Sequence, residues 1–171
     1  MVIAHISSLH DRQLFDCGVD DMNRYLREQA KQEADKGMSH TFISLADDGI
    51  RIIGYYTLTT GFIDFEHIPQ EKRLSRHPAP VVLLARLAVG NACKGQRIGE
   101  RLLFDAQARA LEVAETVGIY AMTLDAREDS LCSYYEQFGF KRRADGPLRM
   151  YKTMKAIRSL SLVAEPLTRK D

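Results

Sequence analysis

The sequence lacks most of the features that mark secreted, metal-binding and membrane proteins. Its three cysteines, Cys17, Cys93 and Cys132, are odd in number and have no paired spacing, so neither a disulfide framework nor a zinc knuckle is predicted. The five histidines have no metal-ligand spacing, and we expect no metal. No apolar run approaches a membrane span, and the first residues lack the basic flank and apolar core of a signal peptide. We therefore expect a cytoplasmic protein that does not bind a membrane.

The distribution of charge is more informative than the net charge of +1. Residues 70–110 contain eight Lys and Arg against three Asp and Glu, and residues 141–158 contain seven against one. In residues 111–136 the balance is reversed, with one against six. A basic face beside an acidic one favours a polyanionic partner, although solvated lysines and arginines are the ordinary alternative.

The stretch that organises the chain runs from Val81 to Ala114. Residues 81–89 are apolar except for Arg86, which predicts a buried strand, and apolar residues recur at helical spacing from Ile98. The intervening turn, NACKGQRIG, therefore opens a helix, and its free N–H groups together with its basic side chains predict a site for a phosphate-bearing ligand. A charge at Arg86 must be paired or face a cleft, so a structural ion pair and a place near the substrate both stay open.

Two motifs indicate the ligand. The turn has neither the three glycines of a dinucleotide fingerprint nor the Gly-Lys-Ser/Thr of a P-loop. It resembles the acetyl-CoA loop of the GNAT acetyltransferases, Gln/Arg-x-x-Gly-x-Gly/Ala, with Lys94 first, Gly99 last, and Arg97 where the family usually has a glycine. An L-residue at that glycine position requires a negative φ. A second block, AREDSLCSYYEQFGF at 126–140, resembles the family's late helix and Gly-Phe turn, with Tyr134 and Tyr135 as its aromatic pair.

The narrower resemblance is to the GNAT-type toxins of bacterial toxin–antitoxin pairs, through FDCG at 15–18 and LARLAV at 84–89 after Pro80. It implies an α/β GNAT fold with a mixed sheet of six or seven strands flanked by helices. It also implies an acetyl-CoA-dependent enzyme that acetylates the α-amino group of aminoacyl-tRNA, forms a homodimer and is neutralised by a ribbon-helix-helix antitoxin. A GNAT enzyme of a small amine or a protein N-terminus and a non-catalytic CoA-binding module remain alternatives.

The resemblance also assigns site residues. Tyr135 stands where the family commonly places the acid that protonates the leaving thiolate, and packing under Phe140 is its alternative role. Cys132 lies one helical turn earlier, but no His or Asn is placed as its partner, so direct transfer is preferred. Acetyl-CoA is expected on Leu87, Ala88, Val89, Lys94, Gly95, Gln96, Arg97, Ile98, Gly99, Ser130 and Tyr135. The tRNA is expected on Arg73, Arg76, Arg86, Lys141, Arg142 and Arg143.

The remaining segments alternate between strands and helices, without a linker that would divide the chain. We expect one domain over 1–157 and an unanchored C-terminal tail over 158–171 that frays. A helix is predicted from a capping aspartate, Asp20 or Asp21, to Gly37. Further strands are predicted at 2–9, 41–46, 52–59, 119–124, 140–143 and 148–154, an irregular connection at 62–80, and a short helix at 130–137.

Overall fold

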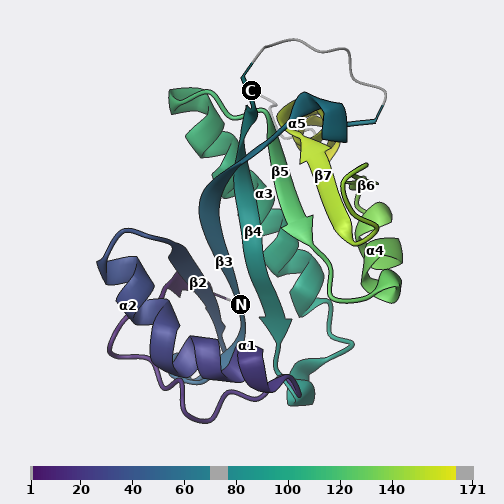
Figure 1. Ribbon diagram of the computed structural model, residues 1–171. Coiled ribbons are helices and arrows are strands. Elements are labelled where there is room, and N and C mark those ends of the chain that lie inside the picture. The colour runs from purple at the N-terminus through teal and green to yellow at the C-terminus, as the bar shows by residue number, and fades with distance from the viewer. Residues whose placement is uncertain (1, 70–76, 165–171) are drawn as a thin grey trace, which may run out of the picture. The chain divides into compact units, whose positions relative to one another are not determined.

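The computed structural model describes residues 2–69 and 77–164, with side chains described as far as residue 159 (Figure 1). Seven strands form one sheet in the order β1-β2-β3-β4-β5-β7-β6, which confirms the predicted α/β class and the predicted strand number. The chain forms two compact units. The first comprises Met1–Thr60 with Leu83–Ala106, and the second comprises Gly61–Val82 with Gln107–Asp171.

The elements follow the predicted order along the chain. The strands are β1 (Val2–His5), β2 (His40–Leu45), β3 (Ile52–Ile63), β4 (Ala79–Val89), β5 (Ala121–Asp125), β6 (Lys141–Arg142) and β7 (Arg149–Thr153). The helices are α1 (Asp20–Arg24), α2 (Ala30–Asp35), α3 (Ile98–Thr116), α4 (Asp129–Glu136) and α5 (Met154–Ala164), with a π-helical turn η1 (Tyr25–Gln29) and short 3₁₀ segments η2 (Phe65–His67) and η3 (Asn91–Cys93).

The first helical segment differs from its prediction at its start and agrees at its end. Asp20 is already helical, and the N-cap is Val19, which makes no side-chain capping bond, so the predicted aspartate cap is wrong. The π-helical turn lies between α1 and α2, in a segment that was predicted as one regular helix. Gly37 ends the segment with a φ of +67°, a conformation that favours glycine, as predicted.

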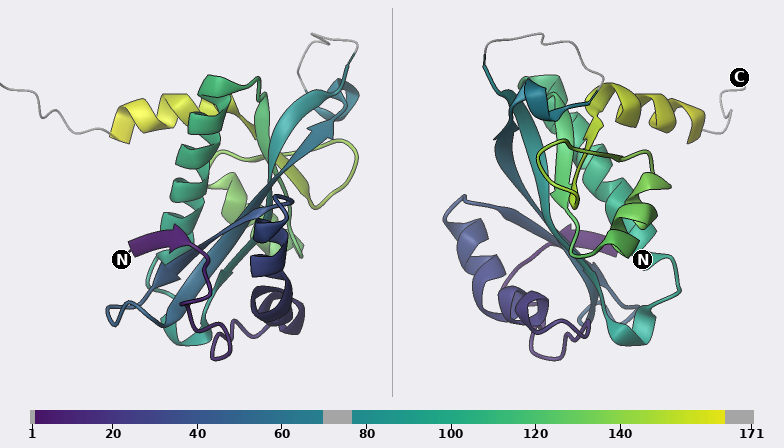
Figure 2. Two further views of the ribbon diagram at one scale, coloured as in Figure 1. Left: turned by 90° about the vertical axis from the view of Figure 1, so that its left-hand side faces the viewer. Right: turned by 45° about the vertical axis from the view of Figure 1, so that its right-hand side comes forward.

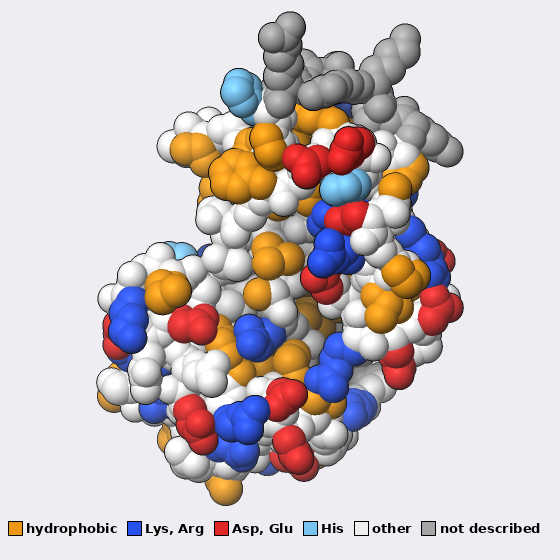
Figure 3. Space-filling view, viewed as in Figure 1, with side chains coloured by type: hydrophobic (Ala, Val, Ile, Leu, Met, Phe, Trp, Pro, Cys, Tyr) orange, Lys and Arg blue, Asp and Glu red, His pale blue; other side chains and the backbone are white. Residues whose placement is uncertain are grey.

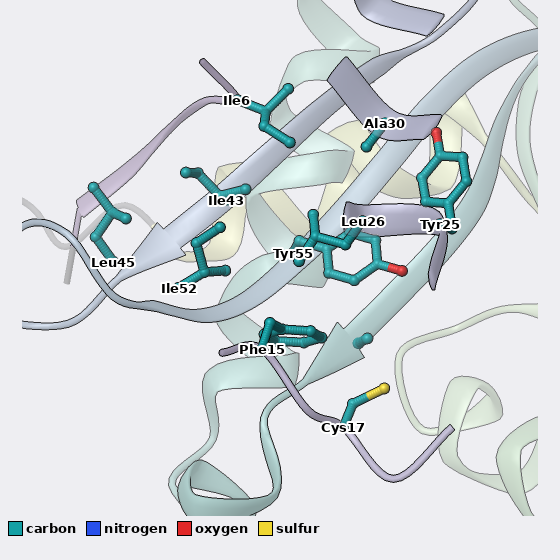
Figure 4. Close-up of a cluster of buried hydrophobic side chains, with 11 residues drawn as sticks. Ile6, Phe15, Cys17, Tyr25, Leu26, Ala30, Ile43, Leu45, Ile52 and Tyr55 are labelled. Atoms are coloured by element: carbon teal, nitrogen blue, oxygen red, sulfur yellow. The ribbon is translucent and has the colours of Figure 1, made fainter. Parts of the chain in front are cut away.

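A cluster of buried aromatic and aliphatic side chains holds the first unit together (Figure 4). Tyr25 and Leu26 of η1 pack with Tyr55 of β3, and all three are almost completely inaccessible to solvent. Phe15 lies edge-on to Tyr55, with ring centroids 5.5 Å apart. Cys17 is 5% exposed and belongs to the same cluster. The apolar packing of Phe15 and Cys17 therefore anchors the loop between β1 and α1 to the sheet.

The second unit is built on the antiparallel pairs β5–β7 and β6–β7. Its apolar cluster consists of Ile63, Ile68, Ala79, Val81, Ala121 and Tyr151. The last strand ends at Thr153, and α5 continues directly from it (Figure 2). Residues 158–164 of the expected tail are therefore helical, and residues 165–171 lie outside the described residues.

Lys152 of β7 is a buried cation, 2% exposed. Its Nζ donates a hydrogen bond to Oε1 of Gln107, 2.6 Å away, and lies 5.8 Å from the ring centroid of Phe140. Within the described residues no carboxylate forms an ion pair with it. Burial without a counter-charge lowers the pKa of Lys152, because the protonated form loses hydration that one hydrogen bond does not replace.

The stability of the protein should therefore rise with pH because of Lys152. Between the lowered pKa of the folded state and the pKa of about 10.4 in the unfolded chain, the unfolded state binds more protons, so the free energy of unfolding increases with pH. The increase amounts to about 1.4 kcal/mol for each unit by which the pKa is lowered. Denaturant unfolding between pH 7 and pH 10 should show this rise in the wild type and in the exposed control Lys155→Met. An equal rise in Lys152→Met would assign it to another group.

Candidate active site

The turn before α3 presents a row of unpaired backbone donors in the first unit. Within the described residues, no acceptor takes the N–H groups of residues 95–100, and the first helical bond runs from Arg101 N to Arg97 O over 3.2 Å. Aligned N–H groups and the positive end of a helix dipole attract an anion. Within the turn, Ile98 is buried, Cys93 and Gly99 are partly buried, and the other residues are exposed. This geometry fits the predicted phosphate site.

Arg97 adopts a backbone conformation that favours glycine. Its φ is +57°, the one positive φ of a non-glycine among the described residues. The expectation of a negative φ is therefore wrong: the turn keeps the left-handed backbone that the family's glycine allows, at a cost of roughly 1–2 kcal/mol for an L-residue. The Arg97 side chain is exposed and has no ion pair within the described residues, so its positive charge adds to the donors of the turn.

The two other long polar side chains of the turn bond to backbone carbonyls. Lys94 Nζ donates to the carbonyl oxygen of Cys17 over 3.1 Å, and Gln96 Nε2 donates to that of Ala92 over 3.4 Å. Gly95, between them, has a φ of +79°. Lys94 therefore ties the turn to the loop at 15–18, in addition to contributing positive charge at the predicted site.

The end of β4 leads into this turn. Ala88 is buried, whereas Leu87 and Val89 are partly buried. Arg86 is also partly buried, and its guanidinium carbon lies 3.7 Å from the centroid of the Tyr25 ring, a cation–π contact. No carboxylate forms an ion pair with Arg86 anywhere in the described ranges, so the predicted alternative of a structural ion pair is not found there. Stacking on Tyr25 leaves the in-plane N–H donors of Arg86 available to a ligand.

Tyr135 of α4, in the second unit, is a buried phenol, 9% exposed. Its ring lies edge-on to Phe140 and to Tyr134, with centroid distances of 5.8 Å and 5.3 Å. Its hydroxyl group makes no hydrogen bond to any described residue. Burial raises the pKa of Tyr135 to about 12, so the phenol keeps its proton throughout the neutral range.

Three neighbours of Tyr135 on α4 are Cys132, Tyr134 and Ser130, and each contacts another residue of the chain. The Cys132 thiol is fully buried and 3.8 Å from the carbonyl oxygen of Pro147, and burial raises its pKa, which agrees with a packing role. Tyr134 packs edge-on against Phe138 at 5.0 Å. Ser130 is exposed, and its hydroxyl group donates a hydrogen bond to Glu128.

Two of the three basic residues predicted to contact tRNA on β6 and just after it are ion-paired. Arg142 Nη1 lies 2.5 Å from Asp129 Oδ1, and its Nε lies 2.8 Å from Glu136 Oε1. Arg143 forms a bidentate pair with Asp145, which also binds Arg149 at 2.9 Å. Hydrogen bonds to Asp129 and Glu136 raise the pKa of Arg142.

Lys141, by contrast, is exposed and has no ion pair within the described part of the chain. On the face drawn in Figure 3, Lys and Arg side chains lie beside Asp and Glu side chains. The basic face predicted from residue counts is therefore reduced by internal pairing. Arg73 and Arg76 lie outside the described residues.

Comparison with known proteins identifies the family. Residues 16–149 match the model of the acetyltransferase (GNAT) domain. The chain belongs to the GNAT acetyltransferase family. The matched range contains both motifs, the turn at 94–99 and the aromatic pair on α4, so the resemblance inferred from the sequence is confirmed.

This GNAT chain is 32% identical over 156 residues to a tRNA-acetylating toxin of Mycobacterium tuberculosis, covering 91% of the chain and 93% of the relative. It is 24% identical to a probable toxin TacT of Sinorhizobium fredii, covering 88% and 89%. Among solved structures, a tyrosine-to-phenylalanine mutant of KacT is 26% identical with a TM-score of 0.87, covering 93% of this chain and 98% of that one. AtaT complexed with acetyl-methionyl-tRNAfMet superposes with a TM-score of 0.86 at 22% identity, covering 94% and 98%, a likeness of fold alone.

Some residues that shape this GNAT site were missed by sequence reasoning. A hydrogen bond joins the side chains of Asp16 and Asn91, which are 75 positions apart in the chain. No local sequence pattern predicts a contact over that separation. The FDCG motif carries part of the resemblance to the toxins, but the sequence alone assigns its aspartate no role. The sequence contained one signal, an acidic residue inside a motif shared with the toxin subfamily.

In the described part of the chain, no helix combines the length and the apolar character needed to cross a membrane.

Proposed function

We propose that this protein is the toxin of a toxin–antitoxin pair and transfers an acetyl group from acetyl-CoA to the α-amino group of aminoacyl-tRNA. The single observation that carries the proposal is the turn at 94–99, where unpaired N–H groups open α3 and Arg97 has a left-handed backbone at the position where the family usually has a glycine. The tRNA-acetylating toxin of Mycobacterium tuberculosis, which is similar over nearly the whole length, supports the choice of substrate.

The residues of the turn fit a pyrophosphate. The N–H groups of residues 95–100 supply neutral donors, and Arg97 supplies a positive charge next to them. Bound acetyl-CoA would supply the thioester, and the N–H groups of residues 87–89 are the proposed donors to its carbonyl oxygen. Because Ser130 is exposed and hydrogen-bonded to Glu128, we assign it a peripheral place in this set.

Transfer needs a neutral amine, a polarised carbonyl group and a proton for the leaving thiolate. The α-amino group of an aminoacyl ester has a pKa below the value of about 8 for a free α-amine, so much of it is uncharged at pH 7. The amine nitrogen forms the new bond to the acetyl carbon, the carbon–sulfur bond breaks, and the amine loses a proton to water. Tyr135 is the proposed donor of the proton that the sulfur takes up, and the resulting phenolate regains a proton from water.

The raised pKa of Tyr135 is compatible with this role. The phenol remains protonated until a thiolate forms. A thiolate in equally apolar surroundings also has a raised pKa, so burial raises both values and does not have to widen the gap between them. Burial raises the pKa of the nearby Cys132 thiol in the same way. The absence of a hydrogen bond from the Tyr135 hydroxyl group to any described residue leaves its proton available.

Arg86 is the proposed contact of the substrate near its reacting end. A partly buried guanidinium without a carboxylate partner among the described residues is poorly compensated, and a phosphate of the acceptor strand would supply the missing charge. Lys141 is the proposed contact from the second unit. Of the other candidates, Arg142 and Arg143 first have to leave their carboxylates, so we assign them a supporting role.

Replacing Arg86 by methionine should raise the KM for charged tRNA about tenfold, the cost of one charge-assisted contact. The KM for acetyl-CoA should change little, and the slope of log KM for tRNA against log salt should fall by about one, since one phosphate contact is lost. Arg158→Met, at an exposed position of α5, serves as the control. An unchanged salt slope in Arg86→Met would remove Arg86 from the phosphate contacts.

The resemblance to the toxins also supports proposals about partners. We propose a homodimer in the cytoplasm and a ribbon-helix-helix antitoxin as the neutralising partner. KacT, which is 26% identical, has been solved as a KacTA–DNA complex with a TM-score of 0.81. A short antitoxin gene beside the gene for this chain would support that pairing.

The decisive experiment is transfer of label from acetyl-CoA to total charged tRNA. Label should appear on the amino group of one or more aminoacyl-tRNAs and should be absent with uncharged tRNA. Label on polyamines or proteins alone would replace the proposal by a GNAT enzyme of those amines. Binding of acetyl-CoA without transfer to any amine would indicate a non-catalytic module.

A further inference from the structure

We infer that Asp16 and Asn91 form a clamp that holds the acetyl-CoA turn in its anion-binding conformation, so that Asp16 is a positioning residue for the cofactor. The inference rests on the proposed use of acetyl-CoA. It adds a role for the loop between β1 and α1, whose four-residue FDCG motif the proposed chemistry does not use. Both halves of the clamp lie in the first unit.

The clamp has contacts between both side chains and backbones. Asn91 Nδ2 donates to Asp16 Oδ2 over 3.2 Å, and Asn91 N donates to the carbonyl oxygen of Asp16 over 2.8 Å. Three residues further along the turn, Lys94 Nζ reaches the carbonyl oxygen of Cys17. The start of the turn, residues 91–94, is therefore fastened to residues 16–17 by three hydrogen bonds.

Asp16 is itself held in place. Its Oδ1 accepts the N–H of Gly18 and the Nδ2 of Asn23, each over 2.8 Å. Asn23 Oδ1 accepts in turn the N–H of Cys17 over 2.9 Å. Hydrogen bonds from Gly18 and Asn23 lower the pKa of Asp16, so the clamp carries a full negative charge at neutral pH and its bonds are charge-assisted.

One glycine allows the loop and the turn to approach this closely. A Cβ on Gly18, whose φ is +81°, would lie 3.1 Å from Asn91 Oδ1. The loop is anchored at its other side by Phe15 and Cys17 in the apolar cluster, so the clamp joins the turn to a rigid support.

The turn needs such a support because Arg97 is strained. An L-residue in the left-handed region persists where the surrounding structure fixes it. Gln96 makes one long bond within the turn, and residues 95–97 give their N–H groups to no described acceptor, so the turn has few bonds of its own. The clamp supplies external constraint at the point where the chain leaves β4, before the strained residue.

The test compares two acetyl donors, one with a pyrophosphate and one without. Asn91→Ala and Asp16→Asn should each raise the KM for acetyl-CoA about tenfold with kcat unchanged, whereas kcat/KM for S-acetyl-pantetheine should stay at the wild-type value. Asp11→Asn is the matched control, because Asp11 lies on the same loop between β1 and α1 and its Oδ1 likewise accepts a backbone N–H group, from Gln13. It should leave the use of both donors unchanged.

A second arm tests the link to strain. In an Arg97→Gly background, Asn91→Ala should raise the KM for acetyl-CoA by about threefold or less, because glycine needs no external constraint to enter the left-handed region. An equal loss with both donors, or no loss with acetyl-CoA, would overturn the clamp. A wild-type protein that uses neither donor would instead overturn the proposed function on which the clamp rests.

Discussion

Replacing Tyr135 with phenylalanine is expected to lower kcat by about 10²–10⁴-fold, the usual loss when a general acid is removed. The change deletes one oxygen atom and keeps the ring, so the edge-on contacts with Phe140 and Tyr134 remain. The Tyr135 hydroxyl makes no hydrogen bond to a described residue, and its loss therefore leaves no described partner unsatisfied. Folding and the Kd for acetyl-CoA should stay near their wild-type values, measured by thermal unfolding and calorimetry.

Tyr134→Phe is the matched control for Tyr135→Phe, one position earlier on the same helix. Its kcat should be close to that of the wild type, because the Tyr134 ring packs against Phe138 and is expected to act through its apolar surface. In cells, the Tyr135→Phe gene should be tolerated where the wild-type gene arrests growth. A Tyr135→Phe protein with full activity and full toxicity would leave Tyr135 as a packing residue.

Reversing the charge of Arg97 should have the second largest effect. Arg97→Glu places a carboxylate beside the unpaired N–H groups of residues 95–100 and should raise the Kd for acetyl-CoA by roughly 10–150-fold, the equivalent of about 1.5–3 kcal/mol. The backbone of the turn is not expected to change, since glutamate and arginine have the same difficulty with a positive φ. Calorimetry with CoA measures the effect directly.

Two companion variants separate the charge of Arg97 from its conformation. Arg97→Gly removes the charge but relieves the left-handed strain, so its affinity should fall less than tenfold while Tm rises by about 2–4 °C. Arg101→Glu makes the same charge reversal one turn further along α3 and should have a smaller effect on Kd. Wild-type affinity in Arg97→Glu would place the pyrophosphate elsewhere.

The order of elements and the chemistry of the site could be read from the sequence because both are written in local patterns. The apolar run of β4, the helical spacing after Ile98 and the Tyr134–Tyr135 pair are each properties of fewer than about twenty consecutive residues. They predicted a cofactor turn and a candidate acid, and they indicated the family, which the comparison confirms. The number of strands followed from the alternation of strand-like and helix-like segments along the chain.

The tertiary structure decided which basic side chains are available to bind a polyanionic ligand. Lys141, Arg142 and Arg143 are equivalent in a count of charges, yet Arg142 and Arg143 are paired with carboxylates on α4 and after β6, whereas Lys141 is exposed. Lys152 belongs to the same basic segment and is buried.

The tertiary structure also decided the backbone conformation of Arg97. A local rule assigned it a negative φ, and the structure gives it a positive one in a turn that Asp16 and Asn91 fasten to a distant loop. The local preference against a positive φ amounts to about 1–2 kcal/mol, which a few hydrogen bonds between distant segments can outweigh. The sequence by itself therefore determined the elements and the kind of chemistry, and the contacts between distant segments determined the conformation and the charge that the site presents.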